Sequence, residues 1–129
     1  MNITTDMLND NQRKAVEWEE GPLLVLAGPG SGKTAVLTLR IANLIKNSPD
    51  ENYRIIGLTF TVKAADEMQN RIKDLLGEMN QRVQLCTFHS FCTELLRQHG
   101  SHLGLRPDFS VITDEKDRVA ILKELKGKK

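Results

Sequence analysis

The stretch that decides the fold is LVLAGPGSGKT, residues 24–34. An apolar run leads into a loop with three glycines, and Lys33 and Thr34 follow at its end. The order is close to the phosphate-binding pattern G-x-x-x-x-G-K-S/T, with Ala27 where that pattern begins with glycine. Glycines let consecutive backbone N–H groups turn toward one anion, and a helix that starts there adds N–H groups without partners. The stretch therefore predicts a strand, a phosphate-binding loop and a helix in direct succession.

Within this loop each residue type has a chemical task. A lysine reaches the β- and γ-phosphates of a nucleoside triphosphate, so Lys33 is the predicted phosphate clamp. A hydroxyl ligates Mg²⁺, and Thr34 is the predicted metal ligand. Gly30 and Gly32 keep the loop open for close approach of the phosphates. The sequence thus predicts a nucleoside triphosphate and Mg²⁺ as ligands of this loop, and it says little about the reaction.

Three apolar, strand-like runs alternate with helical patterns along the chain. The runs are residues 23–26, 54–60 and 84–88, and the helical patterns that follow them are 33–46, 62–76 and about 90–99. In the second of these helices, Ala65, Met68, Ile72 and Leu76 share one face. Strands that alternate with helices are typical of an α/β fold with a parallel sheet. We therefore predict a parallel sheet flanked by helices.

The two ends of the chain add smaller elements. A short helix is predicted around residues 11–18, before the loop. Glycines at 100 and 104 and Pro107 indicate a joint, after which we expect a strand at 109–112. A last helix is expected to open at Thr113 or Asp114 and to run to about residue 125.

Composition limits the class of protein. The chain has 129 residues, of which 40% are hydrophobic and 27% charged, as in one ordinary globular domain. The net charge of +1 indicates no basic field for nucleic acid. The longest apolar run is too short to cross a bilayer, and two close cysteines form no disulfide framework. We expect a cytoplasmic protein with reduced thiols and no membrane partner.

Four blocks of the sequence resemble the UvrD/Rep/PcrA-like superfamily 1 DNA helicases. AGPGSGKT at 27–34 is similar to motif I of that family, in which alanine is ordinary at the first position. LNDNQRKAV at 8–16 is similar to the Q motif, TFTVKAADEM at 59–68 resembles motif Ia, and CTFHSFC at 86–92 is similar to motif Ib. The resemblance is clear over residues 8–91 and weaker beyond them.

This resemblance implies a fold and a domain plan. It implies a P-loop NTPase of the RecA-like type, a three-layer α/β/α arrangement whose sheet is incomplete in this chain. Residues 1–100 would be the N-terminal part of the ATP-binding domain 1A, and residues 101–129 the start of the connection towards subdomain 1B. The chain would be an N-terminal fragment or a truncated relative, and the rest of the helicase chain (1B, 2A and 2B) would be its partner.

The resemblance also extends the candidate nucleotide site. In the family the glutamine at the position of Gln12 reads the adenine edge, and the arginine at the position of Arg40 packs against the adenine ring. Taken alone, either residue is an ordinary exposed helix residue. The resemblance implies ATP as the nucleotide, with Lys33 and Thr34 as catalytic residues. The candidate nucleotide site comprises Gln12, Ala27, Gly28, Pro29, Gly30, Ser31, Gly32, Lys33, Thr34, Ala35 and Arg40.

Motifs Ia and Ib imply contacts with single-stranded DNA. Phe60, at a predicted strand end, is a candidate to stack on a base, although on its own it is an ordinary core residue. The other candidate contacts to the single strand are Thr61, Lys63, Thr87 and His89. Val62 stands where the family usually has asparagine, which removes a polar side chain from the expected DNA track.

Two further interpretations of the motif Ib region remain. Cys86, His89 and Cys92 are spaced by threes, but structural zinc needs four ligands and no fourth is at a suitable spacing. His89 on its own is also compatible with a purely structural role. We therefore predict no metal site beyond the Mg²⁺ that accompanies the nucleotide.

The predicted function is the ATP-binding portion of an ATP-dependent DNA helicase or translocase acting on single-stranded DNA. Hydrolysis also needs an acidic pair at a strand end and arginines for the developing charge. Asp66 and Glu67 fall within a helix, and Asp50 and Glu51 precede a strand, so the chain alone is expected to lack ATPase and unwinding activity. The alternatives are a stand-alone nucleotide-binding module without motor action, a P-loop kinase, and RNA as the track.

Overall fold

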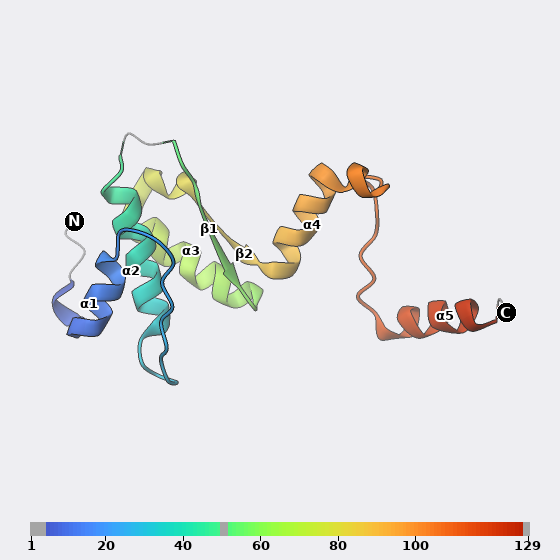
Figure 1. Ribbon diagram of the computed structural model, residues 1–129, viewed down its shortest axis with the longest axis horizontal. Coiled ribbons are helices and arrows are strands. Elements are labelled where there is room, and N and C mark those ends of the chain that lie inside the picture. Colours follow the sequence, from blue (N-terminus) through green and yellow to red (C-terminus); the bar gives the residue numbers. More distant parts are fainter. Residues whose placement is uncertain (1–4, 50–51, 128–129) are drawn as a thin grey trace. The chain divides into compact units, whose positions relative to one another are not determined.

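The structure, a computed structural model, describes residues 5–49 and 52–127, in two compact units that divide between Phe88 and His89. Figure 1 shows the order of the elements along the chain. The first unit contains η1 (Thr5–Met7), α1 (Asp10–Glu17), α2 (Lys33–Lys46), β1 (Ile55–Thr59), α3 (Val62–Leu76), η2 (Gly77–Arg82) and β2 (Val83–Thr87). The chain continues through α4 (Phe88–His99), η3 (Gly100–Leu103) and α5 (Glu115–Lys126).

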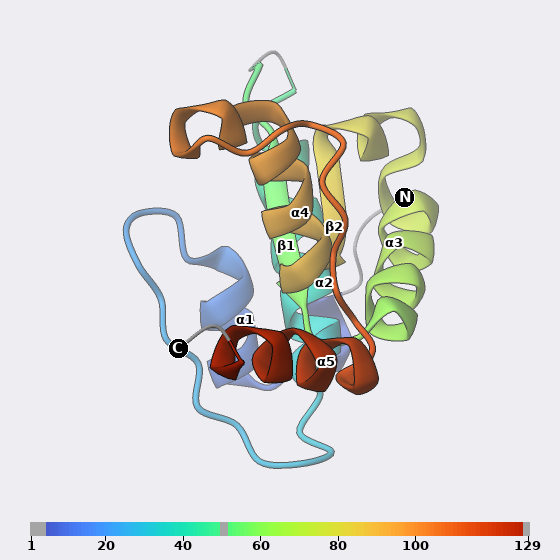
Figure 2. The same ribbon diagram turned by 90° about the vertical axis from the view of Figure 1, so that its right-hand side faces the viewer.

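β1 and β2 form a parallel pair, with α3 as the connection between them. Their register runs from Ile55 opposite Val83 to Thr59 opposite Thr87. Figure 2 shows the two strands side by side, with α2 and α3 along them. Parallel strands require such a crossover, usually a helix. The predicted α/β class and the parallel pairing are confirmed.

The main core lies where α2 and α3 pack against one face of this strand pair. Its buried residues are Ile41, Ala42, Ile45, Met68, Ile72, Leu76 and Val83. The predicted apolar face of α3 is confirmed, since all four of its residues are buried. In α2, the buried face consists of Val36, Thr38, Ile41, Ala42 and Ile45, and Leu37 is exposed. A Cβ at Gly57 would lie 2.2 Å from Leu85 Cδ2, so glycine lets this side chain lie over the strand.

The predicted strand at residues 23–26 is wrong. This segment has no strand partner among the described residues, and Leu24 and Leu26 are 82% and 87% exposed. In Figures 1 and 2 the chain between α1 and α2 is an open loop. An apolar run becomes a strand only when a neighbouring strand takes up its N–H and C=O groups, and β1 pairs with β2 instead. The sheet therefore has two strands within residues 5–49 and 52–127.

α1 packs on α2 through a second, smaller cluster. Ala15 and Val16 of α1 are buried against Val36 of α2, and Leu8 and Leu39 pack on them. Asn9 caps α1 in a capping box, because its side chain accepts a hydrogen bond from Gln12 N at 2.9 Å and Gln12 Oε1 accepts one from Asn9 N at 3.0 Å. The helix predicted at 11–18 is thus present, one residue earlier at each end.

The second unit differs from the sequence prediction in one segment. Residues 109–112 form no strand. The guanidinium carbon of Arg97 lies over the ring of Phe109, 5.0 Å from the ring centroid. Arg97 also donates to Pro107 O at 2.9 Å, which holds this segment onto α4. The last helix is confirmed as α5, with Asp114 as its N-cap. None of the helices in the described part of the chain is long and apolar enough to cross a membrane.

Candidate functional site

The loop before α2 is a sharp turn with two left-handed glycines. Gly30 and Gly32 have φ values of +71° and +80°, which residues with a Cβ rarely adopt. The N–H and the hydroxyl of Ser31 both donate to Gly28 O, at 3.3 and 2.6 Å, and Pro29 and Gly30 form the turn between them. The glycine-rich part of the sequence therefore folds as a tight loop that leads directly into a helix.

The N-terminus of α2 presents free hydrogen-bond donors at the end of this loop. Gly32 is the N-cap, and no side chain caps the helix. Val36 N bonds to Gly32 O at 3.0 Å, whereas the N–H groups of Lys33, Thr34 and Ala35 have no acceptor within residues 5–49 and 52–127. Such unpaired groups, with the positive end of the helix dipole, form a ready site for an anion.

Lys33 folds back over the loop. Its Nζ donates to Ala27 O at 3.1 Å and to Gly28 O at 2.9 Å. The carbonyl groups fix the position of the ammonium without neutralising its charge, and none of the described carboxylates forms an ion pair with it. A localised positive charge beside free helix N–H groups suits the phosphate chain of a nucleotide.

Thr34 supplies the hydroxyl of the predicted metal site. Its side chain is exposed, and its hydroxyl has no intramolecular partner in the described structure. The hydrogen bond from Thr38 Oγ1, at 2.7 Å, goes to the backbone carbonyl of Thr34 and not to its hydroxyl. Mg²⁺ is usually held by one or two protein groups together with substrate phosphates. One hydroxyl next to a phosphate loop fits that donor set, so Thr34 as the ligand remains a consistent prediction.

Two adjoining hollows lie between α1, the loop and α2. One, of about 340 Å³, is lined by polar groups that include Asn9, Gln12, Ser31 and Lys33. The other, of about 290 Å³, is mostly apolar and includes Leu23, Val25, Leu37 and Arg40. They share the lining residues Ala15, Val25, Lys33 and Val36. A hollow with several polar groups beside a more apolar one suits a phosphate chain and a base.

Gln12 contacts the loop directly. Its Nε2 donates to Ser31 O at 2.9 Å, while its Oε1 accepts from Asn9 N at 3.0 Å. Both ends of the amide are therefore engaged within the protein. The prediction that this amide reads adenine remains untested, and it requires that both hydrogen bonds be exchanged for bonds to the base.

Arg40 has a structural contact that the sequence did not indicate. Its Nη1 donates to Ala15 O at 2.9 Å and also to Trp18 O, which ties α2 to the C-terminal end of α1. The last carbonyls of a helix lack intrahelical partners, so a nearby guanidinium satisfies them. Because Arg40 also lines the apolar hollow, the predicted packing of its face against adenine stays a prediction.

The second group of candidates gathers at the carboxyl ends of β1 and β2. Thr59 and Thr87 pair at the ends of the two strands, so the residues that follow them, Phe60 and Phe88, lie at one edge. Their ring centroids are 5.7 Å apart, with the planes tilted by 49°. Phe60 is 91% exposed, so the alternative interpretation as a core residue is wrong. Phe88 was missed, although both strands end in the same Thr-Phe pair.

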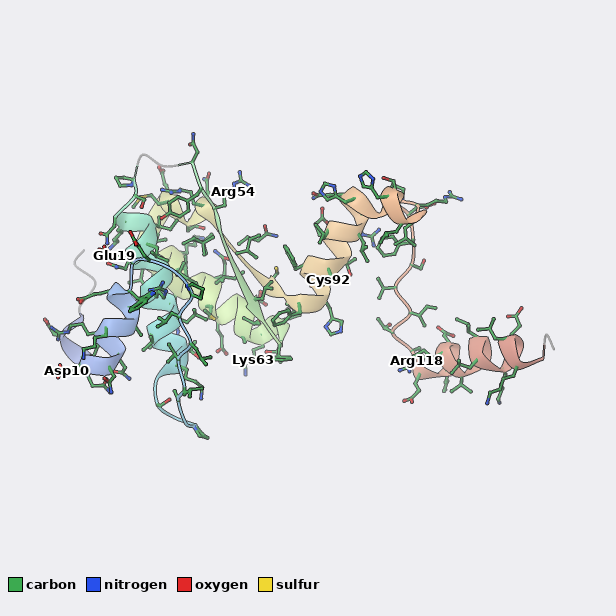
Figure 3. All side chains as sticks on the ribbon, in the orientation of Figure 1. Asp10, Glu19, Arg54, Lys63, Cys92 and Arg118 are labelled. Atoms are coloured by element: carbon green, nitrogen blue, oxygen red, sulfur yellow. The ribbon has the colours of Figure 1, made fainter. Side chains whose placement is uncertain are left out.

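The polar candidates at this edge differ in accessibility. Thr61 caps α3, because its Oγ1 accepts from Ala64 N at 3.2 Å. Figure 3 shows Lys63 just beyond the carboxyl end of β1, where its exposed side chain lies 3.9 Å from Glu67. Thr87 is buried, so a contact of its hydroxyl with DNA would need local rearrangement. His89 is exposed and belongs to the second unit, so its part in this surface stays a prediction.

The three residues considered for zinc do not form a metal site in the described structure. No group of three or more histidine, cysteine, aspartate and glutamate side chains within residues 5–49 and 52–127 could hold a metal ion. Cys86 is half-buried and Cys92 exposed, and both are free thiols.

Comparison with known proteins identifies helicase relatives. The family model described as the UvrD/REP helicase N-terminal domain matches residues 8–129. The chain is 42% identical over 125 residues to the ATP-dependent DNA helicase PcrA of Staphylococcus epidermidis strain RP62A, and 40% identical over 125 residues to that of Staphylococcus aureus strain Mu50. Each match covers 97% of this chain and 17% of the relative, so the chain spans a small part of the length of these relatives.

Proposed function

Because the chain belongs to the UvrD/REP helicase N-terminal domain family, we propose that it is the ATP-binding portion of an ATP-dependent DNA helicase that acts on single-stranded DNA. The observation that carries the proposal is Lys33, whose ammonium lies over the loop next to the unpaired N–H groups at the start of α2. The proposed partners are ATP, single-stranded DNA and the 1B, 2A and 2B parts of a helicase.

The proposal includes a finer fold and a location. We propose that β1 and β2 belong to a larger RecA-like sheet in a three-layer P-loop NTPase. Residues 1–100 would belong to domain 1A and residues 101–129 would start the connection to 1B. A cytoplasmic location is also proposed, in keeping with a DNA track and with the free thiols Cys86 and Cys92.

In the proposed nucleotide complex, different residues contact the phosphates, the metal ion and the base. The backbone of residues 28–32 surrounds the phosphates, and the N–H groups of Lys33, Thr34 and Ala35 donate to them. Lys33 exchanges its bonds to Ala27 O and Gly28 O for phosphate oxygens, and Thr34 would hold Mg²⁺, which neutralises phosphate charge when bound. The apolar hollow beside Arg40 would take the base.

In the proposed DNA complex, Phe60 supplies the stacking surface for an unpaired base. Every base has a π-face, so an exposed ring can bind a single strand without regard to its sequence. Phe88, the first residue after β2, supports this ring, and Lys63 supplies positive charge for the phosphate backbone. Thr61, Thr87 and His89 are the further proposed contacts to that backbone.

Phe60→Ala is expected to weaken binding of a fluorescent oligothymidine by about 5- to 100-fold, because stacking of a base on an aromatic ring contributes about 1–3 kcal/mol. Fluorescence anisotropy at fixed salt measures the change, since affinity for a single strand depends steeply on salt. Phe109→Ala is the matched control, because Phe109 lies in the second unit and packs under Arg97. Equal affinity of Phe60→Ala and wild type would remove Phe60 from the site. Nucleotide binding by a wild-type chain with no affinity for DNA would favour a stand-alone nucleotide-binding module.

The 129-residue chain alone is expected to bind ATP without hydrolysing it at a rate that single-stranded DNA increases. Asp66 and Glu67 lie on α3 rather than at a strand end, and Asp50 and Glu51 lie outside the described residues. Phosphate release with and without oligothymidine measures the rate. A rate of phosphate release that oligothymidine increases in the wild-type chain but not in Lys33→Ala would contradict this part of the proposal.

A further inference from the structure

Gln12 takes part in three side-chain hydrogen bonds within the protein, and two of them involve its own amide. Its backbone N–H donates to Asn9 Oδ1 at 2.9 Å, its Oε1 accepts from Asn9 N at 3.0 Å, and its Nε2 donates to Ser31 O at 2.9 Å. The first is a bond of the Gln12 backbone, the second holds the Gln12 side chain at the start of α1, and the third reaches the phosphate loop, 19 residues later in the chain. One amide thus joins a capped helix to the loop.

The loop is shaped to accept this contact. A Cβ on Gly32 would lie 3.2 Å from Gln12 Nε2, so the amide packs closely against the last glycine of the loop as well as on Ser31 O. Gly32 has a φ of +80° and is the N-cap of α2. The amide therefore contacts Gly32, the residue directly before the helix N–H groups that have no acceptor.

The loop has few other restraints. The whole segment of residues 21–34 is exposed, and the bonds that fix its turn run from Ser31 and Lys33 to carbonyls within the loop itself. Beyond the start of α2, which follows the turn directly, the hydrogen bond found from the turn at 28–32 to another element of the described structure is the one from Gln12 of α1. A loop rich in glycine loses much conformational entropy when it is ordered on a ligand, and a loop ordered beforehand binds more tightly.

We propose that Gln12 is a positioning residue that holds the phosphate loop in its binding conformation through Ser31 O. Gln12 thereby strengthens binding of the triphosphate chain itself, whatever base is attached to it. This inference rests on the proposed nucleotide site, and it differs from adenine reading because it requires the hydrogen bonds seen in the structure rather than their exchange.

The experiment compares two probes, ATP and inorganic tripolyphosphate, on the wild-type chain and two variants. Gln12→Met keeps the length of the side chain and adds no charge, but it removes both amide groups. Gln98→Met is the matched control, since it makes the same change at an exposed position of α4 in the second unit, where the Gln98 amide donates to Glu94 Oε1 at 2.8 Å. Isothermal titration calorimetry measures the affinities, and circular dichroism checks that each variant remains folded.

Gln12→Met is expected to weaken tripolyphosphate and ATP alike, by about three- to tenfold, as the loss of one net hydrogen bond predicts. Gln98→Met is expected to stay within about twofold of wild type. A larger loss for ATP than for tripolyphosphate would still support the inference and add a contact to the base. An unchanged affinity for tripolyphosphate in Gln12→Met would overturn it, and so would an equal loss in Gln98→Met.

A measurement without ligand separates this inference from the proposed function. A wild-type chain that binds neither probe would contradict the proposed nucleotide site. NMR of the chain without ligand would then test whether the Gln12 amide contacts the loop. The signals are nuclear Overhauser cross-peaks between the Gln12 side-chain amide protons and the α-protons of Gly32. Their presence supports the tether to the loop, and their absence overturns it.

Discussion

Lys33→Ala is expected to weaken binding of a fluorescent ATP analogue by about 10- to 100-fold, because hydrogen bonds to charged groups contribute about 1.5–3 kcal/mol each. In the structure the Lys33 ammonium bonds only to Ala27 O and Gly28 O, which are carbonyls that phosphate oxygens can replace without breaking an ion pair. The truncation leaves Gly32 and the N-terminus of α2 unchanged, so some affinity from the free N–H groups should remain.

Two variants make this test specific. Lys73→Ala removes the same charge from an exposed position on α3 and is expected to bind the analogue like wild type. Lys33→Arg keeps the charge but changes its shape, so a partial loss is expected, because a planar guanidinium is not equivalent to a compact ammonium. Equal affinity of wild type and Lys33→Ala would leave the phosphate-clamp assignment without support.

Ile72→Ala is expected to lower the free energy of unfolding by about 2–5 kcal/mol, the usual cost of truncating a fully buried isoleucine. Ile72 is 0% exposed and belongs to the cluster that joins α2, α3 and β2. The truncation removes apolar contacts and leaves a cavity between elements that hold the strands in place. Urea unfolding followed by far-UV circular dichroism measures the change in the midpoint at constant slope.

Two further variants of α3 check the size of this loss in the free energy of unfolding. Ile72→Val removes one methylene and is expected to cost about 0.5–1.5 kcal/mol. Lys73→Ala, next to it on the exposed side, should stay within about 0.5 kcal/mol of wild type. A loss for Ile72→Ala no larger than that for Lys73→Ala would contradict the described core.

The regular elements of the main core could be predicted because their signals are local. The bounds of α2 and α3 agree with the predicted 33–46 and 62–76, since Gly32 and Thr61 supply N-caps and the apolar spacing of α3 continues to Leu76. β1 and β2 agree to within one residue at each end, because each apolar run finds the other as its partner. Motif order alone also indicated the family to which the chain belongs.

The errors arise where structure depends on a partner distant in the sequence. Residues 23–26 are as apolar as β1 but lie beside no strand in the described structure, so their backbone stays out of the sheet. Residues 109–112 have a strand-like composition, but the preceding turn is held on α4 by Arg97. Apolar composition makes a strand possible, and pairing decides whether it forms.

The sequence by itself determined the tight glycine-rich loop, the helix that follows it and the β1–α3–β2 unit, because glycine conformation, capping and periodicity act over a few residues. Only the tertiary structure decided that the Gln12 amide rests on Ser31 O, that Arg40 holds the end of α1, and that Phe60 and Phe88 meet at one edge. These three contacts join residues 19 or more positions apart. Side-chain hydrogen bonds and ring contacts require a particular distance and direction, which packing of the elements fixes and residue spacing does not.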